Sequence, residues 1–542
     1  MNGAHSLVRT LLQGGVDMCF ANPGTSEMHF VAALDNAPGM RCVLGLFEGV
    51  VTGAADGYYR MADRPAATLL HLGPGLANGL ANLHNAKKAR SGIVNIVGDH
   101  AAGHLKLDAP LTSDIEGLAR PMSHWVRTSP SAATIAADGQ EAIRQARHTP
   151  GRIATLILPA DTAWSDTGTD TGVDPGSDAG TAPERAVRAV RAGQAGQAAV
   201  APPPAAELSG SDVGAAAAAL RRGKGTLLLL GGMALREPAT RWAGRLAAAT
   251  GCALMSEFYS ARNQRGAGRV LIPRLPYAVE PSLAALARFD RIVLVGARNP
   301  VAFFAYPDKP GILSRPGCEC ITLSTPEHDP VQALAALAEA LGVGERSAPG
   351  SIASLVDKGL PSGALTPPGI AQVLCALIPE DAIVVDEAVT AGRSLDPATA
   401  GAAPHDWLTG CGGSIGFALP VAVGAALAAP GRRVLALVGD GSAMYTPQAL
   451  WTLARESLDV TVVIFANRAY QILRGEFAGV GAGHMGQRAT DMLTLDRPAL
   501  DWVMLARGMG VPASRVNNLE AFGQALQNAL MADGPVLIEA VL

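Results

Sequence analysis

Short apolar runs alternate with helical stretches along most of this chain. The runs at 153–159, 226–230 and 291–296 consist largely of Val, Ile and Leu, a composition typical of parallel strands that are buried on both faces. Helical stretches such as 215–222 lie between runs of this kind. This alternation predicts an α/β fold with three doubly wound, mostly parallel-sheet domains.

Two stretches of different composition divide the chain. Residues 165–207 are rich in Gly, Ala, Asp, Thr and Pro, which bury little surface, so we expect a linker there. A shorter break at 346–366 predicts a second linker. Because 542 residues are too many for a single core, the sequence predicts three domains, at 1–164, 208–345 and 367–542.

The charge and the cysteines exclude several classes of function. A net charge of −4, without a long basic run, gives no electrostatic footprint for nucleic acid. The chain lacks an uninterrupted apolar segment of the roughly 18 residues that a membrane span needs, and its first residues lack the features of a signal peptide. Seven cysteines without a CxxC pair indicate reduced thiols. The sequence therefore predicts a cytoplasmic protein with no membrane or nucleic-acid partner.

Two oxygen-bearing side chains follow neighbouring strands in the last domain. Asp440 comes after the apolar run that begins at Val434, and Asn467 after the run that begins at Val460, with a predicted crossover helix at 447–458 between them. Because adjacent parallel strands end at the same edge of a sheet, we expect both side chains to lie side by side. A carboxylate and an amide oxygen suit a hard divalent cation that bridges to phosphates. A lone Gly-Asp-Gly is usually an ordinary turn, but the Asn after the next strand favours a metal site.

Three features of the first domain allow both a functional and a plain structural interpretation. Glu48 lies among apolar neighbours before a small-residue helix at 50–62, where it is either a functional buried acid or a charge that stabilises the first turn. Pro23 and Gly24 follow a predicted strand and alone indicate a turn. His71 ends another strand, before a Gly-Pro-Gly turn. Such a histidine is more often structural than catalytic, although it can relay protons near neutral pH.

Together these motifs resemble those of thiamine-diphosphate enzymes. The Gly-Asp-Gly segment followed by Asn467 resembles their diphosphate-anchoring motif, and the pattern around Glu48 resembles their pyrimidine-binding domain. The resemblance covers nearly the whole chain, in the order pyrimidine-binding, central and diphosphate-binding domain of the acetolactate synthase and benzoylformate decarboxylase group. The segments at 22–30 and around Glu48 look closest to acetolactate-synthase-like proteins.

The resemblance implies a site for thiamine diphosphate and Mg²⁺ in the last domain. By this analogy Mg²⁺ is held by Asp440, Asn467 and the backbone carbonyl of Ala469. Ile415 matches the apolar side chain that forces the cofactor into its bent shape. The other positions implied to contact the cofactor here are Thr390, Gly441, Ser442 and Tyr470.

In the first domain the resemblance implies the groups that act on the pyrimidine ring and the substrate. Glu48 would hydrogen-bond the ring, share a proton with it and favour the imino form that activates the thiazolium carbon. Backbone next to a glycine can approach the ring closely. The other implied positions are Pro23, Gly24 and Asn78 at the cofactor, and Thr25 and His71 towards the substrate.

The implied reaction is decarboxylation of a 2-oxo acid, which ends in release of an aldehyde or in ligation to a second carbonyl acceptor. Because family sites combine domains of two subunits, a homodimer is the minimum assembly and a homotetramer is expected. Two alternatives stay open. One is a flavin-linked 2-oxo acid oxidase, although no flavin-binding signature supports FAD. The other is a paralogue that binds thiamine diphosphate without catalysis, against which the intact Glu48, Asp440 and Asn467 argue.

Three departures from the family pattern leave the substrate open. The double histidine of pyruvate decarboxylases is absent, and the segment 471–477 lacks the Trp associated with acetolactate synthases. The segment after Gly296 resembles the central domain of benzoylformate decarboxylase, but the best register places Phe304 where that enzyme has a second active-site His. Since Phe neither donates nor accepts a proton, we expect slow aldehyde release and a bias toward carboligation.

Overall fold

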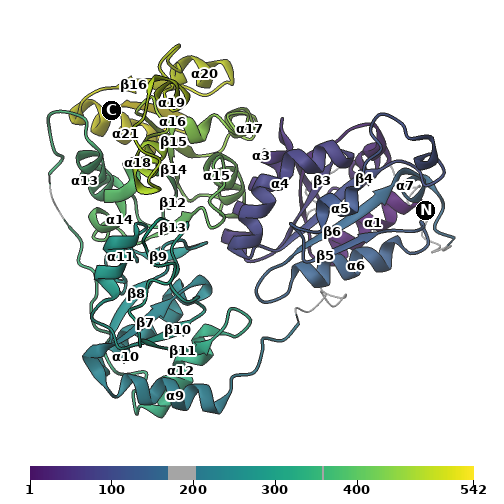
Figure 1. Cartoon of the computed structure of the whole chain (residues 1–542). Helices are drawn as coiled ribbons and strands as arrows, with labels where there is room; N and C mark the ends of the chain where they lie inside the picture. The colour runs from purple at the N-terminus through teal and green to yellow at the C-terminus, as the bar shows by residue number, and fades with distance from the viewer. Residues whose placement is uncertain (169–202, 357–358) are drawn as a thin grey trace. The chain divides into compact units, whose positions relative to one another are not determined.

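A computed structural model describes residues 1–168, 203–356 and 359–542 of the chain (Figure 1). It contains a six-stranded, a four-stranded and a seven-stranded sheet, so the prediction of three doubly wound, mostly parallel sheets is confirmed. The chain divides into two compact units, Met1–Pro204 and Ala205–Leu542. The predicted boundaries of domains and linkers stay predictions, and most of the first linker lies outside the described residues. Among the helices of the described ranges, none is long and apolar enough to cross a membrane.

The first unit is one sheet between two layers of helices. Its strand order is β2-β1-β3-β4-β6-β5, and all of its pairs are parallel. Every residue of β4 and β6 is buried, because helices cover both faces of the sheet. The strands are β1 (Met18–Asn22), β2 (Arg41–Leu44), β3 (Ala66–Leu70), β4 (Ile93–Asp99), β5 (Trp125–Thr128) and β6 (Ile153–Pro159).

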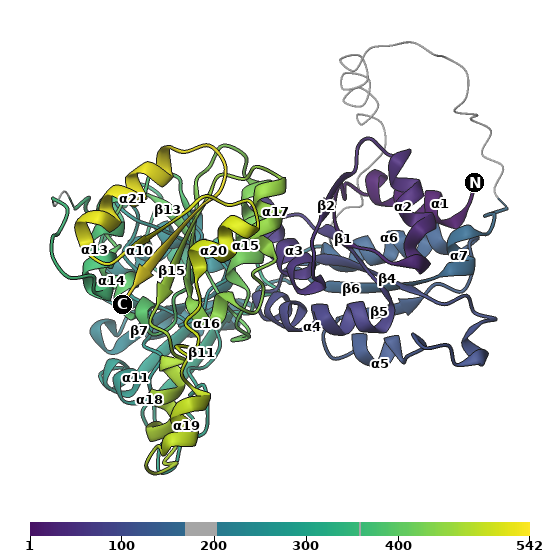
Figure 2. The same ribbon diagram turned by 90° about the horizontal axis from the view of Figure 1, so that it is seen from above.

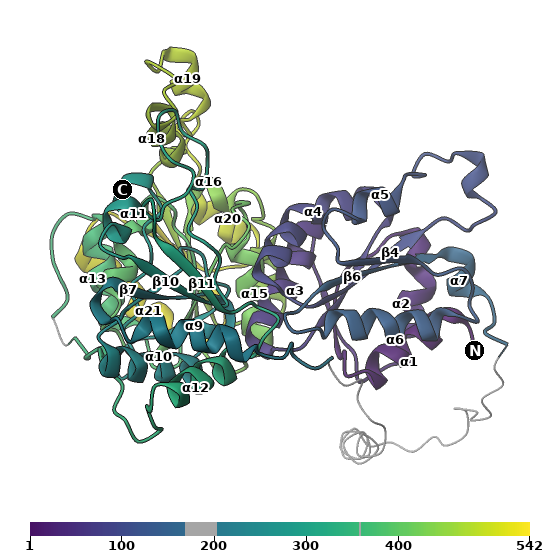
Figure 3. The same cartoon turned by 60° about the horizontal axis from the view of Figure 1, so that its bottom comes forward.

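Helices α4 and α5 cover one face of this sheet, and α1 and α6 cover the other (Figures 2 and 3). Helices α3 and α4 meet through small residues: Thr52 Oγ1 donates to the carbonyl of Gly79 at 3.0 Å. The strand order reverses between β1 and β3, and doubly wound sheets bind their ligands at such a reversal, beyond the carboxyl ends of the strands. The helices are α1 (Gly3–Gln13), α2 (Met28–Asp35), α3 (Glu48–Ala62), α4 (Leu72–Ala89), α5 (Ile115–Ala119), α6 (Ile135–Ala146) and α7 (Ala160–Trp164).

The second unit begins with the four-stranded parallel sheet, in the order β11-β10-β7-β8. The predicted strand 226–230 coincides with β7, because its continuous apolar run is buried on both faces. Helices α9, α10 and α12 pack on one face of the sheet and α11 on the other (Figure 3). The elements are α9 (Gly210–Leu220), β7 (Thr226–Leu230), α10 (Glu237–Thr250), β8 (Ala253–Ser256), α11 (Val279–Leu286), β10 (Arg291–Val295), β11 (Glu319–Ser324) and α12 (Pro330–Ala340).

The seven-stranded sheet of the second unit has the order β16-β17-β15-β14-β12-β13-β9. Helices α13 and α21 lie on one face and α15 and α17 on the other (Figure 1), and the strand order reverses between β12 and β14. The strands are β9 (Asn263–Arg265), β12 (Ile383–Glu387), β13 (His405–Thr409), β14 (Val434–Gly439), β15 (Val460–Ala466), β16 (Ala513–Val516) and β17 (Val536–Val541). The helices are α13 (Pro367–Leu377), α14 (Leu395–Ala398), α15 (Ala418–Ala428), α16 (Asp440–Ala443), α17 (Ala449–Arg455), α18 (Gln471–Gly479), α19 (Gln487–Met492), α20 (Trp502–Gly508) and α21 (Leu519–Met531).

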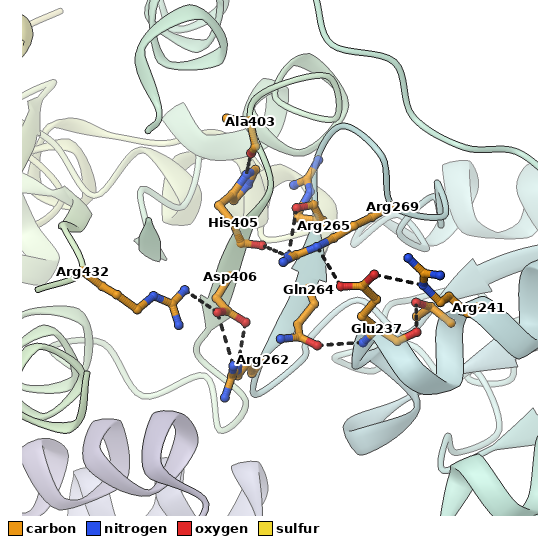
Figure 4. Close-up of polar contacts among 11 residues, drawn as sticks. Glu237, Arg241, Arg262, Gln264, Arg265, Arg269, Ala403, His405, Asp406 and Arg432 are labelled. Atoms are coloured by element: carbon orange, nitrogen blue, oxygen red, sulfur yellow. Dashed lines mark hydrogen bonds and ion pairs between the residues drawn. The ribbon is translucent and has the colours of Figure 1, made fainter. Parts of the chain in front are cut away.

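The edge strand β9 comes from an earlier part of the chain and pairs antiparallel with β13. Beside it, Arg262 Nε donates to Asp406 Oδ1 at 2.6 Å, and Arg432 Nη2 donates to Asp406 Oδ2 at 2.5 Å (Figure 4). Burial alone would raise the pKa of Asp406, but the two guanidinium groups outweigh burial and hold this pKa below its usual range. Backbone pairing and a buried ionic cluster therefore tie residues 262–265 to the last sheet.

Two predicted helices and one predicted turn differ from the structure. Helix α3 begins at Glu48 rather than at residue 50, so the acid lies in the first turn. The Gly-Pro-Gly after His71 forms no separate turn, because α4 begins at Leu72 and a proline is tolerated in a first helical turn, where its missing N–H leaves no bond unmade. The crossover helix predicted at 447–458 is shorter, since regular α17 spans Ala449–Arg455.

Candidate cofactor site

The strand-order reversal of the first sheet brings the loops after β1 and β3 together. β1 ends at Asn22, and His71 is the N-cap of α4 directly after β3. A Cβ on Gly24 would lie 2.3 Å from His71 Nδ1, so the backbone at this position touches the imidazole ring and leaves no room for a side chain. Pro23 precedes this contact, and the exposed Thr25 follows it. The structure thus places the predicted residues of the β1 loop beside His71.

Glu48 lies next to two other predicted site residues. It is 8% exposed, and Asn78 Nδ2 donates to its Oε2 at 3.0 Å. A Cβ on Gly75 would lie 3.0 Å from Glu48 Oε1 and 3.4 Å from His71 Cβ, so the carboxyl and the imidazole flank the same glycine. The first unit therefore holds Glu48, Asn78 and His71 together, and the chemical roles of these residues stay predictions.

Glu27 is a residue of this group that the sequence reasoning missed. It is 1% exposed. Its Oε2 accepts a hydrogen bond from the Gly24 N–H at 2.7 Å and lies 2.8 Å from His71 Nδ1. The spacing of Gly24 and Glu27 is that of a capping box, in which an acid three residues on accepts from the backbone at the helix start. That spacing is the signal that could have found the residue.

The reversal point of the last sheet, between β12 and β14, holds Asp440. This side chain is 3% exposed and accepts two backbone hydrogen bonds, from the Gly441 N–H at 2.9 Å and from the Arg468 N–H at 2.7 Å. Burial raises the pKa of Asp440, and the two backbone donors offset part of that rise. A cation placed at this carboxylate would relieve the same penalty, because it favours the ionised form.

Asn467 and its neighbours meet Asp440 because β14 and β15 are adjacent parallel strands. Asn467 Oδ1 accepts from the Ala469 N–H at 3.0 Å. A Cβ on Gly441 would lie 2.6 Å from the Tyr470 ring, so the ring packs directly on that glycine. Asp440 therefore meets the backbone of the segment that begins at Asn467, and the joint role of the two side chains stays a prediction.

The oxygen atoms of Asp440, Asn467 and the Ala469 carbonyl fit a divalent cation bound to a diphosphate. A carboxylate, an amide oxygen and a backbone carbonyl are ligands that hard cations prefer. Ser442, in the short helix α16 that begins at Asp440, is 6% exposed. Thr390 follows β12, and its Oγ1 is buried without a hydrogen-bond partner in the described part of the chain. Because buried hydroxyls are normally paired, a phosphate oxygen at this hydroxyl would satisfy it.

The loop that carries Ile415 is fixed from three sides. Ile415 itself is half-buried, between Gly413 (φ +73°) and Gly416 (φ +90°), both in a backbone region that favours glycine. Thr446 Oγ1 donates to the Gly416 carbonyl at 2.8 Å, while Glu387 Oε1 accepts from the Gly416 N–H at 2.6 Å. The aromatic cluster described below provides the third side.

Glu387 is the second residue whose role the sequence reasoning did not predict. Besides the Gly416 N–H, its carboxyl accepts from the Ala418 N–H at 2.9 Å, at the start of α15. Burial raises the pKa of Glu387 to about 7, even though these backbone donors lower it. An acid at the end of an apolar strand was the only sequence signal, and it does not show which loop the acid holds.

Aromatic rings from residues 258–306 form a cluster beside this loop. Phe303 contacts Tyr259 and Tyr277, with ring centroids 5.6 and 5.4 Å apart, and a Cβ on Gly413 would lie 2.8 Å from Phe303 Cζ. Phe304 packs on Phe303 with centroids 4.9 Å apart and is 52% exposed. The cluster thus reaches the loop that carries Ile415.

Tyr306 links the same segment to helix α18, which follows the loop after β15. Its hydroxyl donates to Glu476 Oε2, on α18, at 2.8 Å. The predicted site residues therefore form two groups, each assembled within its own unit. One group lies at the β1–β3 reversal of the first unit and the other at the β12–β14 reversal of the second.

Two regions of the chain match family models. Residues 1–124 match the thiamine pyrophosphate enzyme N-terminal TPP-binding domain, and residues 397–540 match the C-terminal TPP-binding domain of the same enzymes. The first match includes the group of the first unit, and the second match includes Asp440, Asn467 and Ile415 of the second unit.

Similar proteins cover the full length of the chain. It is 51% identical over 546 residues to the Mycobacterium tuberculosis protein named "Putative acetolactate synthase large subunit IlvX", with 100% of this chain and 99% of the relative covered. It is 30% identical over 572 residues to benzoylformate decarboxylase of Pseudomonas aeruginosa, with 99% and 98% covered. Among solved structures, a thiamine-diphosphate-dependent 4-hydroxybenzoylformate decarboxylase of Rhodococcus jostii superposes with a TM-score of 0.81 at 26% identity, covering 99% of this chain and 98% of the other.

Proposed function

Because the chain belongs to the thiamine pyrophosphate enzyme family, we propose that it uses thiamine diphosphate and Mg²⁺ to decarboxylate a 2-oxo acid. The remaining carbon skeleton is released as an aldehyde or joined to a second carbonyl. The observation that carries this proposal is the meeting of Asp440 with the 467–469 segment at the ends of paired strands. Without a bound cation, backbone N–H groups alone would compensate for the burial of the Asp440 carboxylate.

The residues of the last sheet would bind the diphosphate end of the cofactor. Asp440, Asn467 and the carbonyl of Ala469 would hold Mg²⁺, which would supply positive charge to balance the diphosphate. The buried hydroxyl of Thr390 and the backbone beside Gly441, in α16, would donate to the phosphates. Helix N-termini attract anions, although α16 is too short to act alone.

The residues of the first sheet would act on the pyrimidine end. Glu48 would share a proton with the ring, and the Asn78 amide at 3.0 Å would keep the carboxyl oriented. Bound thiamine diphosphate supplies a carbon that adds to the keto group and accepts the electrons left when CO₂ departs. The protein contributes orientation, because Ile415 and the Gly24 backbone restrict the shape that the site accepts.

The aromatic cluster supports a substrate with a flat or bulky apolar side chain. Phe303, Tyr259 and Tyr277 pack edge to face or tilted, and the cluster reaches Gly413 of the Ile415 loop. Aromatic faces favour aromatic and aliphatic groups over charged ones. Thr25 and His71 would supply the polar contacts to the substrate carboxylate.

We further propose that the site is assembled from two subunits, so that a homodimer is the smallest active form and a homotetramer the resting assembly. Each unit of the chain holds one group of predicted site residues, and each unit contains one matched TPP-binding domain. An enzyme of this design has no active monomer. Its specific activity should therefore fall on dilution below the dissociation constant of the dimer.

The test is CO₂ release from a panel of 2-oxo acids by purified protein with thiamine diphosphate and Mg²⁺. The panel runs from pyruvate to benzoylformate, with and without an added aldehyde. We expect release from at least one acid, fastest for a bulky apolar side chain, and loss of release in Glu48→Gln. The matched control is Asp138→Asn, which changes a buried acid of the same unit that bonds Ser129 Oγ at 2.8 Å and has no predicted role.

Two results would overturn the proposed reaction. Tight binding of thiamine diphosphate without CO₂ release from any acid would indicate a binding-only paralogue. A yellow protein that consumes O₂ with a 2-oxo acid would indicate a flavin-linked oxidase.

A further inference from the structure

Glu27 is a buried acid to which the proposed function gives no role. It ends the short helix η1 (Thr25–Glu27), directly after the Pro23–Gly24 segment. Burial raises the pKa of its carboxyl, although the Gly24 N–H and His71 lower it. A buried carboxyl is unfavourable unless its contacts compensate for the lost water, so these contacts should explain why the acid is there.

The contacts of Glu27 determine which nitrogen of His71 carries the proton. Glu27 Oε2 lies 2.8 Å from His71 Nδ1, and a carboxylate only accepts hydrogen bonds. With Glu27 ionised, Nδ1 carries the hydrogen, and in the neutral ring Nε2 is then the basic nitrogen. Within the described residues Nε2 makes no hydrogen bond, and the His71 side chain is 24% exposed, so Nε2 is free to meet a ligand.

Tight packing holds this pair in place. A Cβ on Gly98, at the end of β4, would lie 1.7 Å from Glu27 Oε1, so the acid lies directly on that backbone. Oε1 has no hydrogen-bond partner among the described residues, which leaves Oε2 as the oxygen that makes both contacts. On the other side, the Gly24 backbone touches the imidazole ring. Backbone therefore confines both members of the pair.

We propose that Glu27 is a positioning residue that holds His71 in the Nδ1–H form, with Nε2 directed to the substrate. The proposal rests on the proposed function, since it needs a reacting 2-oxo acid beside His71. In the protonation step Nε2, after taking up a proton from water, gives that proton to the reacting carbon or oxygen, while Nδ1–H keeps its hydrogen bond to Glu27. While His71 carries both protons, the nearby carboxylate offsets its positive charge, as in other carboxylate–histidine pairs.

A spectroscopic test reads the tautomer directly and needs no substrate. Protein labelled with ¹⁵N-histidine is compared with His71→Gln to assign the signals of His71. We expect the neutral imidazole of the wild type to show a protonated Nδ1 and a non-protonated Nε2. In Glu27→Gln the amide can donate to Nδ1, so the signals should shift toward the Nε2–H form. A wild-type ring in the Nε2–H form would overturn the proposal, whatever the enzyme's activity.

A kinetic test separates positioning from a structural role. Glu27→Gln should lower kcat by roughly tenfold to a hundredfold, by analogy with other groups that orient a functional histidine, and change KM and thiamine-diphosphate affinity by less than roughly threefold. Asp138→Asn is again the matched control for loss of a buried acid. Equal losses in both variants, or an unchanged kcat in Glu27→Gln, would overturn the proposal. If the wild type releases no CO₂, the proposed function fails, while the tautomer test still decides the role of Glu27.

Discussion

The two strand-order reversals that carry the site residues have the same topology but differ in chemistry. At the β1–β3 reversal, acids pair with other side chains: Glu48 with Asn78, and Glu27 with His71. At the β12–β14 reversal, the acid Asp440 and the neighbouring Glu387 bond mainly to backbone N–H groups.

In the proposed function, this difference would correspond to the two ends of the cofactor. Side-chain pairs can exchange and share protons, which suits the pyrimidine end and the substrate. Acids fixed by backbone donors hold their position but have few mobile protons near them, which suits a metal ion and phosphates. In the proposed function, one sheet geometry would serve acid–base chemistry in one unit and charge binding in the other.

The largest effect in a test of this contrast is expected for Glu48→Gln. The amide keeps the shape of the side chain but cannot share an acidic proton, so turnover should fall by about 10²–10⁴, the usual range for loss of a general acid–base group. Thiamine diphosphate should still bind, because the diphosphate end is unchanged. Steady-state kinetics and calorimetry measure the two effects separately, and near-normal turnover would contradict the role of Glu48.

Asp440→Ala should produce the opposite pattern, with cofactor binding lost first. Loss of groups that merely orient a metal ligand lowers affinity roughly tenfold to a hundredfold, so loss of the ligand itself should lower it at least that much. Calorimetric titration of thiamine diphosphate with Mg²⁺, repeated with a chelator, measures the effect. Unchanged, chelator-resistant binding would show that Asp440 is a turn residue without a role in metal binding.

Glu387 provides a prediction about pH. Its pKa of about 7 in the fold lies above the ordinary 4.5, so the folded state binds this proton more tightly than the unfolded state. The resulting stabilisation is complete below pH 4.5 and is lost as the pH rises through about 7. Urea unfolding from pH 5 to 8 should therefore show wild-type stability falling relative to Glu387→Gln, which cannot titrate. Parallel curves would show that the carboxyl is ionised throughout.

The smallest expected effect concerns Phe304→His. If Phe304 leaves the substrate side without one proton donor, the wild type should form more ligation product than free aldehyde when an aldehyde acceptor is added. The histidine variant should shift the product ratio toward aldehyde by a few-fold, measured by chromatography. Phe304→Leu is the control, because it alters packing without adding a titratable group. A shift of the product ratio of the same size in both variants would contradict the proton-transfer explanation.

The sequence predicted the sheets well, because a buried parallel strand is a continuous apolar run. The runs at 153–159 and 226–230 match β6 and β7 residue for residue. The same reasoning predicted that Asp440 lies near the segment that begins at Asn467, since the two residues directly follow adjacent parallel strands. Glu27 and Glu387 could not be found in this way. Their partners lie 44 and 29 residues away, and only the folded chain shows which loops meet.

The three-residue strand β9 limits how this protein can be dissected. A fragment of residues 367–542 would keep the loops after β14 and β15 but leave β13 as a bare sheet edge, which invites aggregation. It would also bury Asp406 with only one of its two guanidinium partners, and an incompletely paired buried charge is strongly destabilising. A fragment that begins at residue 205 keeps both features. The last sheet is therefore not a transferable module, and any recombination with a relative should exchange residues 262–265 together with β13.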